Sequence, residues 1–116
     1  MAIWIWQAIL IFHVPLAPDT VHMVDAPRIA TMKERSVLVN MSRGGVVDED
    51  ALASALRVGS IGGAALDVFE KEPPSGAILS APNVILTPHI GGQTEEAQAN
   101  AIEVVGEKVR AFFKAP

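Results

Sequence analysis

Three side chains of types that handle acidic substrates follow apolar segments of the chain: Arg43, Glu72 and His89. An arginine grips a carboxylate with two parallel hydrogen bonds. A histidine exchanges protons near neutral pH, and a neighbouring carboxylate favours its imidazolium form. Such a trio would bind a 2-hydroxy or 2-oxo acid and move its hydroxyl proton, a transfer that typically accounts for about 10²–10⁴-fold in rate. This chemistry implies oxidation or reduction at the hydroxyl-bearing carbon.

Each of these side chains also has an ordinary structural interpretation. Arg43 alone is typical of a surface or capping residue, and Glu72 of a solvated loop charge. His89 alone is more often a structural histidine, and Asp67 is suited to ending a strand and capping a turn. The functional interpretation depends on where they lie, because unrelated polar residues would scatter over both ends of a sheet.

The elements that must position these residues alternate between strands and helices. Apolar segments predict strands over residues 9–14, 36–40, 63–69 and 84–86. Helices are expected over about 26–32, 49–58 and 94–114. This alternation predicts βαβ units in an α/β fold with a parallel sheet. The nearly continuous apolar runs predict strands that are covered on both faces.

Capping residues mark the ends of the expected helices. Asp25, with Pro27 in the first turn, suits the first helix, and Asp48 and Gly59 suit the two ends of the second. Thr94 is placed to cap the third. The apolar side chains of this last helix recur at helical spacing and form one face: Ala101, Ile102, Val105, Val109, Phe112 and Phe113.

Ligands of open parallel sheets bind beyond the carboxyl ends of the strands. Arg43 follows the second expected strand, Asp67 and Glu72 belong to the end of the third, and His89 follows the fourth. We therefore expect these residues to meet at one edge of the sheet. A doubly wound sheet with hydride chemistry indicates a nicotinamide cofactor.

Composition narrows the class of protein. A chain of 116 residues with 50% apolar content suits one packed domain rather than a disordered segment. Its net charge of -4 argues against nucleic-acid binding, and the absence of cysteine excludes disulfides and thiolate metal sites. We expect a globular cytoplasmic protein with no metal site.

The apolar segment Met1–Phe12 has two interpretations. It is shorter than the ~20 residues of a membrane helix, and it has no basic start or cleavage site of a signal peptide. Its alternating tryptophan and isoleucine residues favour a buried or edge strand. A membrane anchor is the alternative, and no membrane partner is expected.

Four ordered segments resemble the D-isomer-specific 2-hydroxyacid dehydrogenases. They are His13–Thr20 (HVPLAPDT), Val39–Asp48 (VNMSRGGVVD), Ala64–Pro74 (AALDVFEKEPP) and Thr87–Gly91 (TPHIG), within a resemblance that runs from about Ile9 to Gln98. The resemblance implies a Rossmann-like parallel sheet, the second half of a doubly wound dinucleotide-binding domain.

The resemblance also implies a role for each site residue. Arg43 would bind the substrate carboxylate, His89 would act as the acid–base, and Glu72 would pair with the histidine. Asp67 would accept a hydrogen bond from the nicotinamide amide of NAD, with NADP as the alternative cofactor. The other residues expected at the cofactor, beside Arg43 and His89, are Val14, Pro15, Met41, Ser42, Gly91 and Gly92. His13 and His22 are expected to be structural.

The chain departs from the family in extent. Family members are much longer and begin with a substrate domain, whereas no Gly-x-Gly-x-x-Gly follows any strand here. We expect residues 1–116 to form a partial NAD-binding domain, with 1–8 divergent and 94–114 a long C-terminal helix. The strand at 9–14 would then be an exposed edge.

The leading hypothesis is a fragment of an NAD-dependent oxidoreductase acting on a 2-hydroxy acid. Gly91–Gln98 looks most like the phosphoglycerate dehydrogenases, so 3-phosphoglycerate is the candidate substrate, and the family usually forms homodimers. Alone, the chain should have little or no activity. Two alternatives are a split-enzyme subunit that needs a partner chain and a non-catalytic remnant that pairs strands with a partner.

Overall fold

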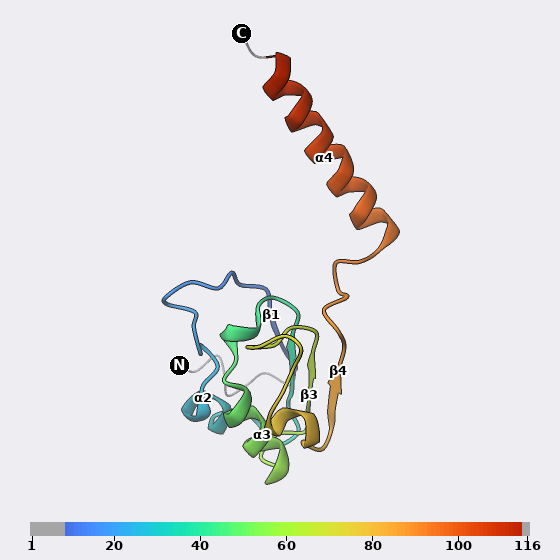
Figure 1. Cartoon of the computed structure of the whole chain (residues 1–116). Coiled ribbons are helices and arrows are strands. Elements are labelled where there is room, and N and C mark those ends of the chain that lie inside the picture. Colours follow the sequence, from blue (N-terminus) through green and yellow to red (C-terminus); the bar gives the residue numbers. More distant parts are fainter. Residues whose placement is uncertain (1–8, 115–116) are drawn as a thin grey trace.

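The computed structural model describes residues 9–114 and contains one sheet of four parallel strands (Figure 1). Its strands, in both sequence and spatial order, are β1 (Ile9–Phe12), β2 (Val37–Asn40), β3 (Gly63–Leu66) and β4 (Val84–Leu86). The helices are α2 (Ala26–Ala30), α3 (Glu49–Arg57) and α4 (Glu95–Lys114), with short 3-10 turns η1 (Gly44–Val46) and η2 (Ala77–Ser80). The α/β fold with a parallel sheet is confirmed.

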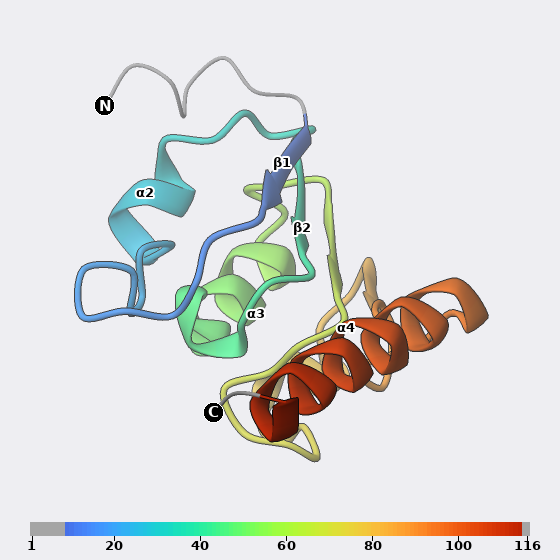
Figure 2. The same ribbon diagram turned by 90° about the horizontal axis from the view of Figure 1, so that it is seen from above.

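The helices α2 and α3 cover one face of the sheet (Figure 2). Successive strand residues point to opposite faces, so Leu38 and Leu66 face these helices and are fully buried. They pack with the largest buried side chains of the connections: Val24, Ile29, Val46, Val47, Leu52 and Ile78. Every strand therefore contributes its inward side to one core.

The other face of the sheet is open among the described residues. Ile9, Ile11 and Ile85 are 59%, 52% and 67% exposed. The expectation of strands covered on both faces is therefore wrong for this part of the chain. The strands follow one another in a single direction across the sheet, and right-handed crossovers then place every connecting helix on the same side.

Local signals placed the starts of the helices more accurately than the ends of the strands. Asp25, Asp48 and Thr94 each accept a hydrogen bond, at 3.0 Å, from the backbone N–H three residues ahead. Gly59 follows α3 with a φ of 71°, a conformation that favours glycine. Three strands are shorter than expected: β1 ends before residue 13, β2 begins at Val37, and β3 ends before residue 67. The helices α2 and α3 likewise end early, at Ala30 and Arg57.

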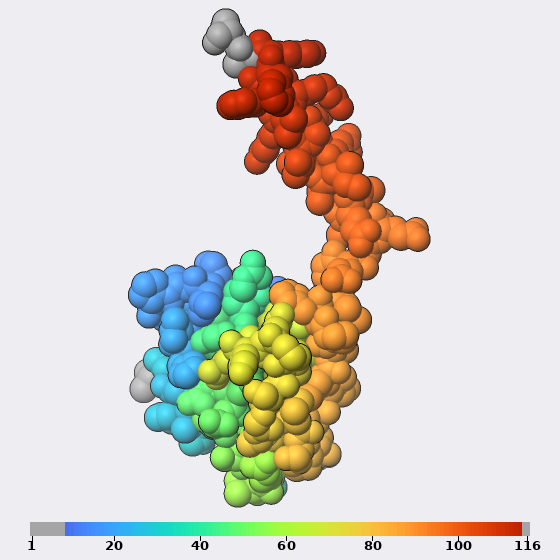
Figure 3. Space-filling model, viewed as in Figure 1, coloured from blue at the N-terminus to red at the C-terminus, as the bar shows by residue number. Residues whose placement is uncertain are grey.

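The long helix α4 projects from the rest of the molecule (Figure 3). It has no buried residue, and Phe112 and Phe113 on its apolar face are 76% and 80% exposed. The molecule consequently extends 61 Å along its longest axis. No helix in residues 9–114 is long and apolar enough to span a membrane. The interpretations of residues 1–8 lie outside the described residues.

Candidate active site

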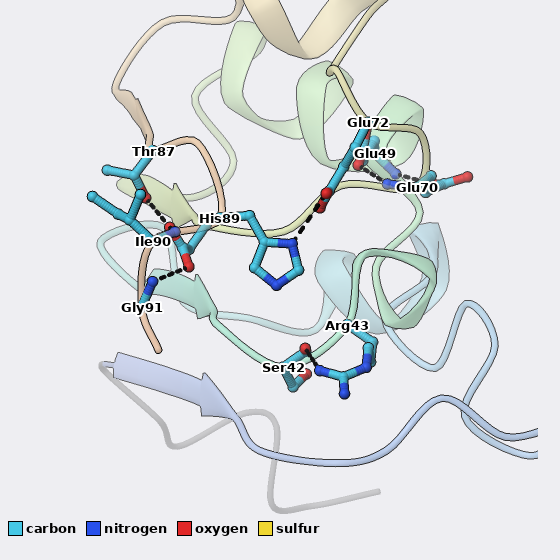
Figure 4. Close-up of polar contacts among 10 residues, drawn as sticks. Ser42, Arg43, Glu49, Glu70, Glu72, Thr87, His89, Ile90 and Gly91 are labelled. Atoms are coloured by element: carbon cyan, nitrogen blue, oxygen red, sulfur yellow. Dashed lines mark hydrogen bonds and ion pairs between the residues drawn. The ribbon is translucent and has the colours of Figure 1, made fainter. Parts of the chain in front are cut away.

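The turn after β2 positions Arg43. The buried side chain of Asn40 accepts hydrogen bonds from the Ser42 backbone N–H (3.1 Å) and hydroxyl (2.9 Å), and its amide donates to the Arg43 carbonyl at 3.0 Å. The exposed guanidinium of Arg43 donates from Nη1 to the Ser42 carbonyl at 2.7 Å (Figure 4). Within residues 9–114 this is its one hydrogen bond, so most of its donors are available to an anion.

The glycine after Arg43 lets two loops touch. A Cβ on Gly44 would lie 1.8 Å from the Phe69 carbonyl oxygen. A side chain is impossible at that distance unless the backbone moves. The loop that carries Arg43 is thereby held directly against the loop that leads from β3 toward Glu72.

Asp67, at the end of β3, anchors the loop that follows β4. This carboxylate is 5% exposed and accepts hydrogen bonds from the Thr87 hydroxyl (2.6 Å), Ile90 N–H (2.9 Å) and Gly91 N–H (2.7 Å). Burial opposes ionisation, but these bonds outweigh it and lower the pKa of Asp67 below its ordinary range. The aspartate therefore fixes the residues on either side of His89.

His89 and Glu72 form a direct pair. The Nδ1 atom of His89 lies 3.0 Å from Oε2 of Glu72, and the two side chains are 52% and 42% exposed (Figure 4). This contact lowers the pKa of the Glu72 carboxyl. With Nδ1 engaged by the carboxylate, Nε2 is left to face a ligand. The pair borders an open hollow of about 490 Å³, lined by Glu72, Pro88, His89, Gly92 and Gln93.

A second, smaller hollow lies beside Asp67 at the carboxyl end of the sheet. It measures about 90 Å³ and is lined by Val39, Met41, Ala65, Leu66, Asp67, Ile85 and Thr87. A Cβ on Gly91 would come within 2.9 Å of Asp67 Oδ2 and 3.0 Å of the Met41 methyl, so the wall is closely packed here. Oδ2 accepts a single hydrogen bond and retains a lone pair. This chemistry fits a flat apolar ring that carries an amide.

The remaining residues expected at the cofactor lie on the loops of the same edge. Val14 is half-buried against the core, and the Pro15 carbonyl accepts a hydrogen bond from the Thr20 hydroxyl at 2.7 Å. Gly92 is exposed, and a Cβ there would meet nothing within 4 Å. His13 is also exposed. No cluster of three metal-ligating side chains occurs in the described part of the chain.

A cluster behind the site has no recognisable signal in the sequence. Glu49 N–H donates to Glu70 Oε1 at 2.9 Å, and Glu70 N–H donates to Glu49 Oε1 at 2.6 Å. His22 Nε2 lies 3.2 Å from the same Glu70 oxygen. Burial, together with the neighbouring carboxylates, raises the pKa of Glu49. Each of these residues resembles an ordinary loop or helix-start residue in the sequence, because their partners lie 21 or more positions away.

One family model matches most of the chain. Residues 3–91 match the NAD binding domain of the D-isomer specific 2-hydroxyacid dehydrogenases. This match begins six residues before Ile9, the position at which the resemblance in the motifs starts.

Individual relatives divide between different named activities. The chain is 49% identical over 103 residues to a D-3-phosphoglycerate dehydrogenase of Methanocaldococcus jannaschii, covering 88% of this chain and 20% of that protein. It is 46% identical over 103 residues to a glyoxylate reductase of Thermococcus litoralis, covering 88% and 31%.

A solved structure also has this fold. The NADPH-dependent glyoxylate/hydroxypyruvate reductase of Sinorhizobium meliloti, in complex with NADP and malonate, superposes with a TM-score of 0.91 at 36% identity. The superposition covers 98% of this chain and 36% of that one. The chain thus spans between a fifth and about a third of the length of these proteins. It belongs to the D-isomer specific 2-hydroxyacid dehydrogenase family and contains part of the family's Rossmann-like NAD-binding domain.

Proposed function

We propose that the chain carries the acid–base and substrate-binding residues of an NAD-dependent D-2-hydroxyacid dehydrogenase. The observation that carries the proposal is the 3.0 Å contact between His89 Nδ1 and Glu72 Oε2 at the carboxyl edge of the sheet. The loop of Arg43 ends at this edge too, and its guanidinium has free donors. An arginine beside a histidine–carboxylate pair suits a substrate that carries both a carboxylate and a 2-hydroxyl or 2-oxo group.

Each side chain then has a defined task. Arg43 holds the substrate carboxylate and so orients C2 of the substrate. In oxidation, Nε2 of His89 takes the hydroxyl proton as the C2 hydride leaves, and in reduction it returns that proton to the oxo oxygen. Glu72 orients the imidazole through Nδ1 and stabilises the imidazolium that forms. When bound, a nicotinamide cofactor accepts or supplies the hydride.

NAD is the proposed cofactor, with NADP as the alternative. Asp67 would accept a hydrogen bond from the nicotinamide amide, and the apolar hollow beside it would hold the ring. Val14, Pro15, Met41, Ser42, Gly91 and Gly92 would line the remainder of the site. The matched family domain binds NAD, and the S. meliloti relative was solved with NADP.

The proposal includes a candidate substrate and an oligomeric state for the complete enzyme. Similarity to D-3-phosphoglycerate dehydrogenases favours 3-phosphoglycerate, whereas the glyoxylate reductases favour a smaller 2-oxo acid. We propose that residues 1–116 represent a partial NAD-binding domain in which 94–114 form a long C-terminal helix. Because the family match already includes residues 3–8, the proposal does not retain the expected divergence of 1–8. Because this domain usually mediates dimerisation in the family, a homodimer is expected for the complete enzyme.

The first test is a calorimetric titration of the purified chain with NADH, with Asp67→Ala as the control. The chain lacks the glycine-rich motif that would hold the pyrophosphate, so we expect no binding up to millimolar cofactor. Micromolar binding that Asp67→Ala abolishes would show that the site is completed, for instance by self-association. An assay with 2-oxo acids would then follow.

A hybrid protein tests the catalytic residues directly. Residues 9–114 would replace the matching segment of the M. jannaschii relative, and NADH oxidation would be followed with glyoxylate, hydroxypyruvate and the 2-oxo acid of 3-phosphoglycerate. We expect turnover that falls by about 10²–10⁴-fold in the His89→Ala variant. A folded hybrid that is no more active than its His89→Ala variant would contradict the proposal.

The exposed edge of β1 favours a second candidate function. Ile9 and Ile11 on this edge strand are more than half exposed, and a strand from another chain can pair with such an edge. The partner would be the glycine-rich half of a split enzyme or an extended peptide bound by a non-catalytic remnant. Restoration of NADH binding by a separately expressed glycine-rich half would favour the split enzyme.

A further inference from the structure

We propose that Glu70 and Glu49 are positioning residues that hold Glu72 against His89. The inference rests on the proposed roles of Glu72 and His89, but it concerns a contact behind the site that involves neither of them. It assigns a purpose to the pair of glutamates that joins the loop after β3 to the start of α3.

The two glutamates bind each other reciprocally. Glu70 Oε1 accepts the backbone N–H of Glu49 at 2.9 Å, while Glu49 Oε1 accepts the backbone N–H of Glu70 at 2.6 Å. Glu49 is the first residue of α3, where backbone N–H groups have no partner within the helix. Asp48 already caps Ala51, so Glu70 supplies a second carboxylate to this helix end from another loop.

The charge of the cluster suits its place in the fold. The N-terminus of a helix carries a partial positive charge that favours nearby carboxylates. Each carboxylate also accepts an N–H of the other residue, which offsets the repulsion between them. His22, from the loop after β1, makes a second contact with Glu70 Oε1, which is the third contact of the cluster. The cluster therefore joins three separate segments of the chain.

Besides a backbone contact of Phe69 with the Glu72 carboxyl group, the segment that contains Glu72 has few other anchors. Phe69 is buried, but no side chain between it and Ile78 is buried. Glu70 stands two positions before Glu72, at the point where the chain leaves the core. Fixing the Glu70 backbone limits the reach of the next two residues. The reciprocal Glu49–Glu70 pair, called the clamp below, therefore determines whether Glu72 can meet the imidazole of His89.

Carboxyl titrations by carbon-13 NMR test this on the intact chain. In the wild type, the contact with His89 holds the pKa of Glu72 below its ordinary value of 4.5. We expect Glu70→Ala and Glu49→Ala each to raise the Glu72 midpoint toward that value, because the segment moves away from the histidine. Asp50→Ala is the matched control, since Asp50 lies on the same turn, is exposed, and its side chain makes no hydrogen bond described in residues 9–114.

Two internal checks separate positioning from general loss of structure. Asp67 titrates below its ordinary value because of bonds on the other side of the site, and its midpoint should stay low in every variant. Glu70→Gln keeps an acceptor oxygen at the same distance from the backbone. Glu70→Asp shortens the side chain by one methylene group, so its oxygen no longer reaches the Glu49 N–H. We therefore expect a wild-type Glu72 midpoint in the former and a raised midpoint in the latter.

Unchanged Glu72 midpoints in Glu70→Ala and Glu49→Ala would overturn the inference. If these variants do not fold, equal Glu72 midpoints in Glu70→Gln and Glu70→Asp would overturn it instead. The titrations require neither cofactor nor turnover. An inactive hybrid protein would thus contradict the proposed function without contradicting the positioning role of Glu49 and Glu70. An active hybrid would support the proposed function but could not replace a negative result of the titrations.

Discussion

The side chains of the site differ in how deeply they are buried and in how many hydrogen bonds hold them. Asp67 is buried and accepts three hydrogen bonds, whereas Arg43 is exposed and uses one donor on its own neighbour. His89 and Glu72 are intermediate, because they are half-exposed but contact each other. Substitutions at Asp67 should therefore act on stability as well as on cofactor binding, and substitutions at Arg43 mainly on ligand binding.

Asp67→Asn should change how stability depends on pH. The folded-state pKa of Asp67 lies below its ordinary value of 3.8, so its contribution is full above that value and is lost as the pH falls through the folded-state pKa. The variant should be less stable by about 1–3 kcal/mol near neutral pH and should lose less stability on acidification.

Urea unfolding at about pH 7 and about pH 3 would measure both effects. Asp50→Asn, at an exposed aspartate, should behave like the wild type. If acidification destabilises Asp67→Asn as much as the wild type, the three hydrogen bonds do not favour the charged form.

Arg43→Lys should weaken substrate binding in the hybrid protein. Lysine presents a point charge and cannot reproduce two parallel hydrogen bonds to a carboxylate. We expect the KM for the 2-oxo acid to rise about tenfold, equivalent to about 1.4 kcal/mol, with a smaller change in kcat. The control is Arg57→Lys, because the Arg57 side chain donates a hydrogen bond to the Ala77 carbonyl. Steady-state kinetics of the two variants would show whether the effect is specific to Arg43. Equal KM values in both variants would argue against the role of Arg43.

At the scale of elements, the site depends on contacts between loops rather than on any single strand. The loop after β2 touches the loop after β3 at Gly44, and the loop after β4 is tied to β3 through Asp67. The strands bring these loops to one edge, and the contacts between loops then set the distances within the site. A change at one contact should therefore be felt across the site.

Gly44→Ala should destabilise the chain strongly. The new methyl group would stand 1.8 Å from the Phe69 carbonyl oxygen, and the obstacle is backbone rather than a flexible side chain. We expect a loss of at least about 2 kcal/mol in the free energy of unfolding. Gly92→Ala is the matched control, because nothing lies within 4 Å and its change should stay within about 0.5 kcal/mol. Similar thermal midpoints for the two variants would be inconsistent with this packing.

At the scale of the whole molecule, apolar surface remains uncovered in two places. One is the open face of the sheet, to which the exposed side chains of the edge strand β1 belong, and the other is the apolar face of α4, all within residues 9–114. Contiguous exposed apolar surface of this kind usually marks an interaction site or an aggregation hazard. The isolated chain is therefore expected to self-associate.

Sedimentation velocity over a range of concentrations would test this association. Ile11→Lys places a charge on the open face next to the β1 edge and should shift the chain toward the monomer. Leu79→Lys is the control, because Leu79 is similarly exposed (53%, against 52% for Ile11) but lies on η2, away from that face. A wild-type chain that stays monomeric, with the amides of β1 protected from exchange, would rule out association through this edge.

Much of the fold could be predicted from local signals. Asp25, Asp48 and Thr94 cap helices through hydrogen bonds that span three residues, so the sequence alone identifies them. The alternation of apolar segments with these helices likewise predicts a parallel sheet. Strand ends were less predictable: Val68 and Phe69 are apolar and buried although β3 has already ended at Leu66.

The amino-acid sequence by itself determined the α/β class, the helix caps and the side chains that gather at the carboxyl edge, because these follow from residue type and short-range spacing. Only the tertiary structure decided that helices cover a single face of the sheet and that Glu49 and Glu70 clamp each other. The first outcome depends on the hand of the crossovers, and the second on a contact between residues 21 positions apart. Neither leaves a local pattern, since such contacts exist only after the chain has brought distant segments together.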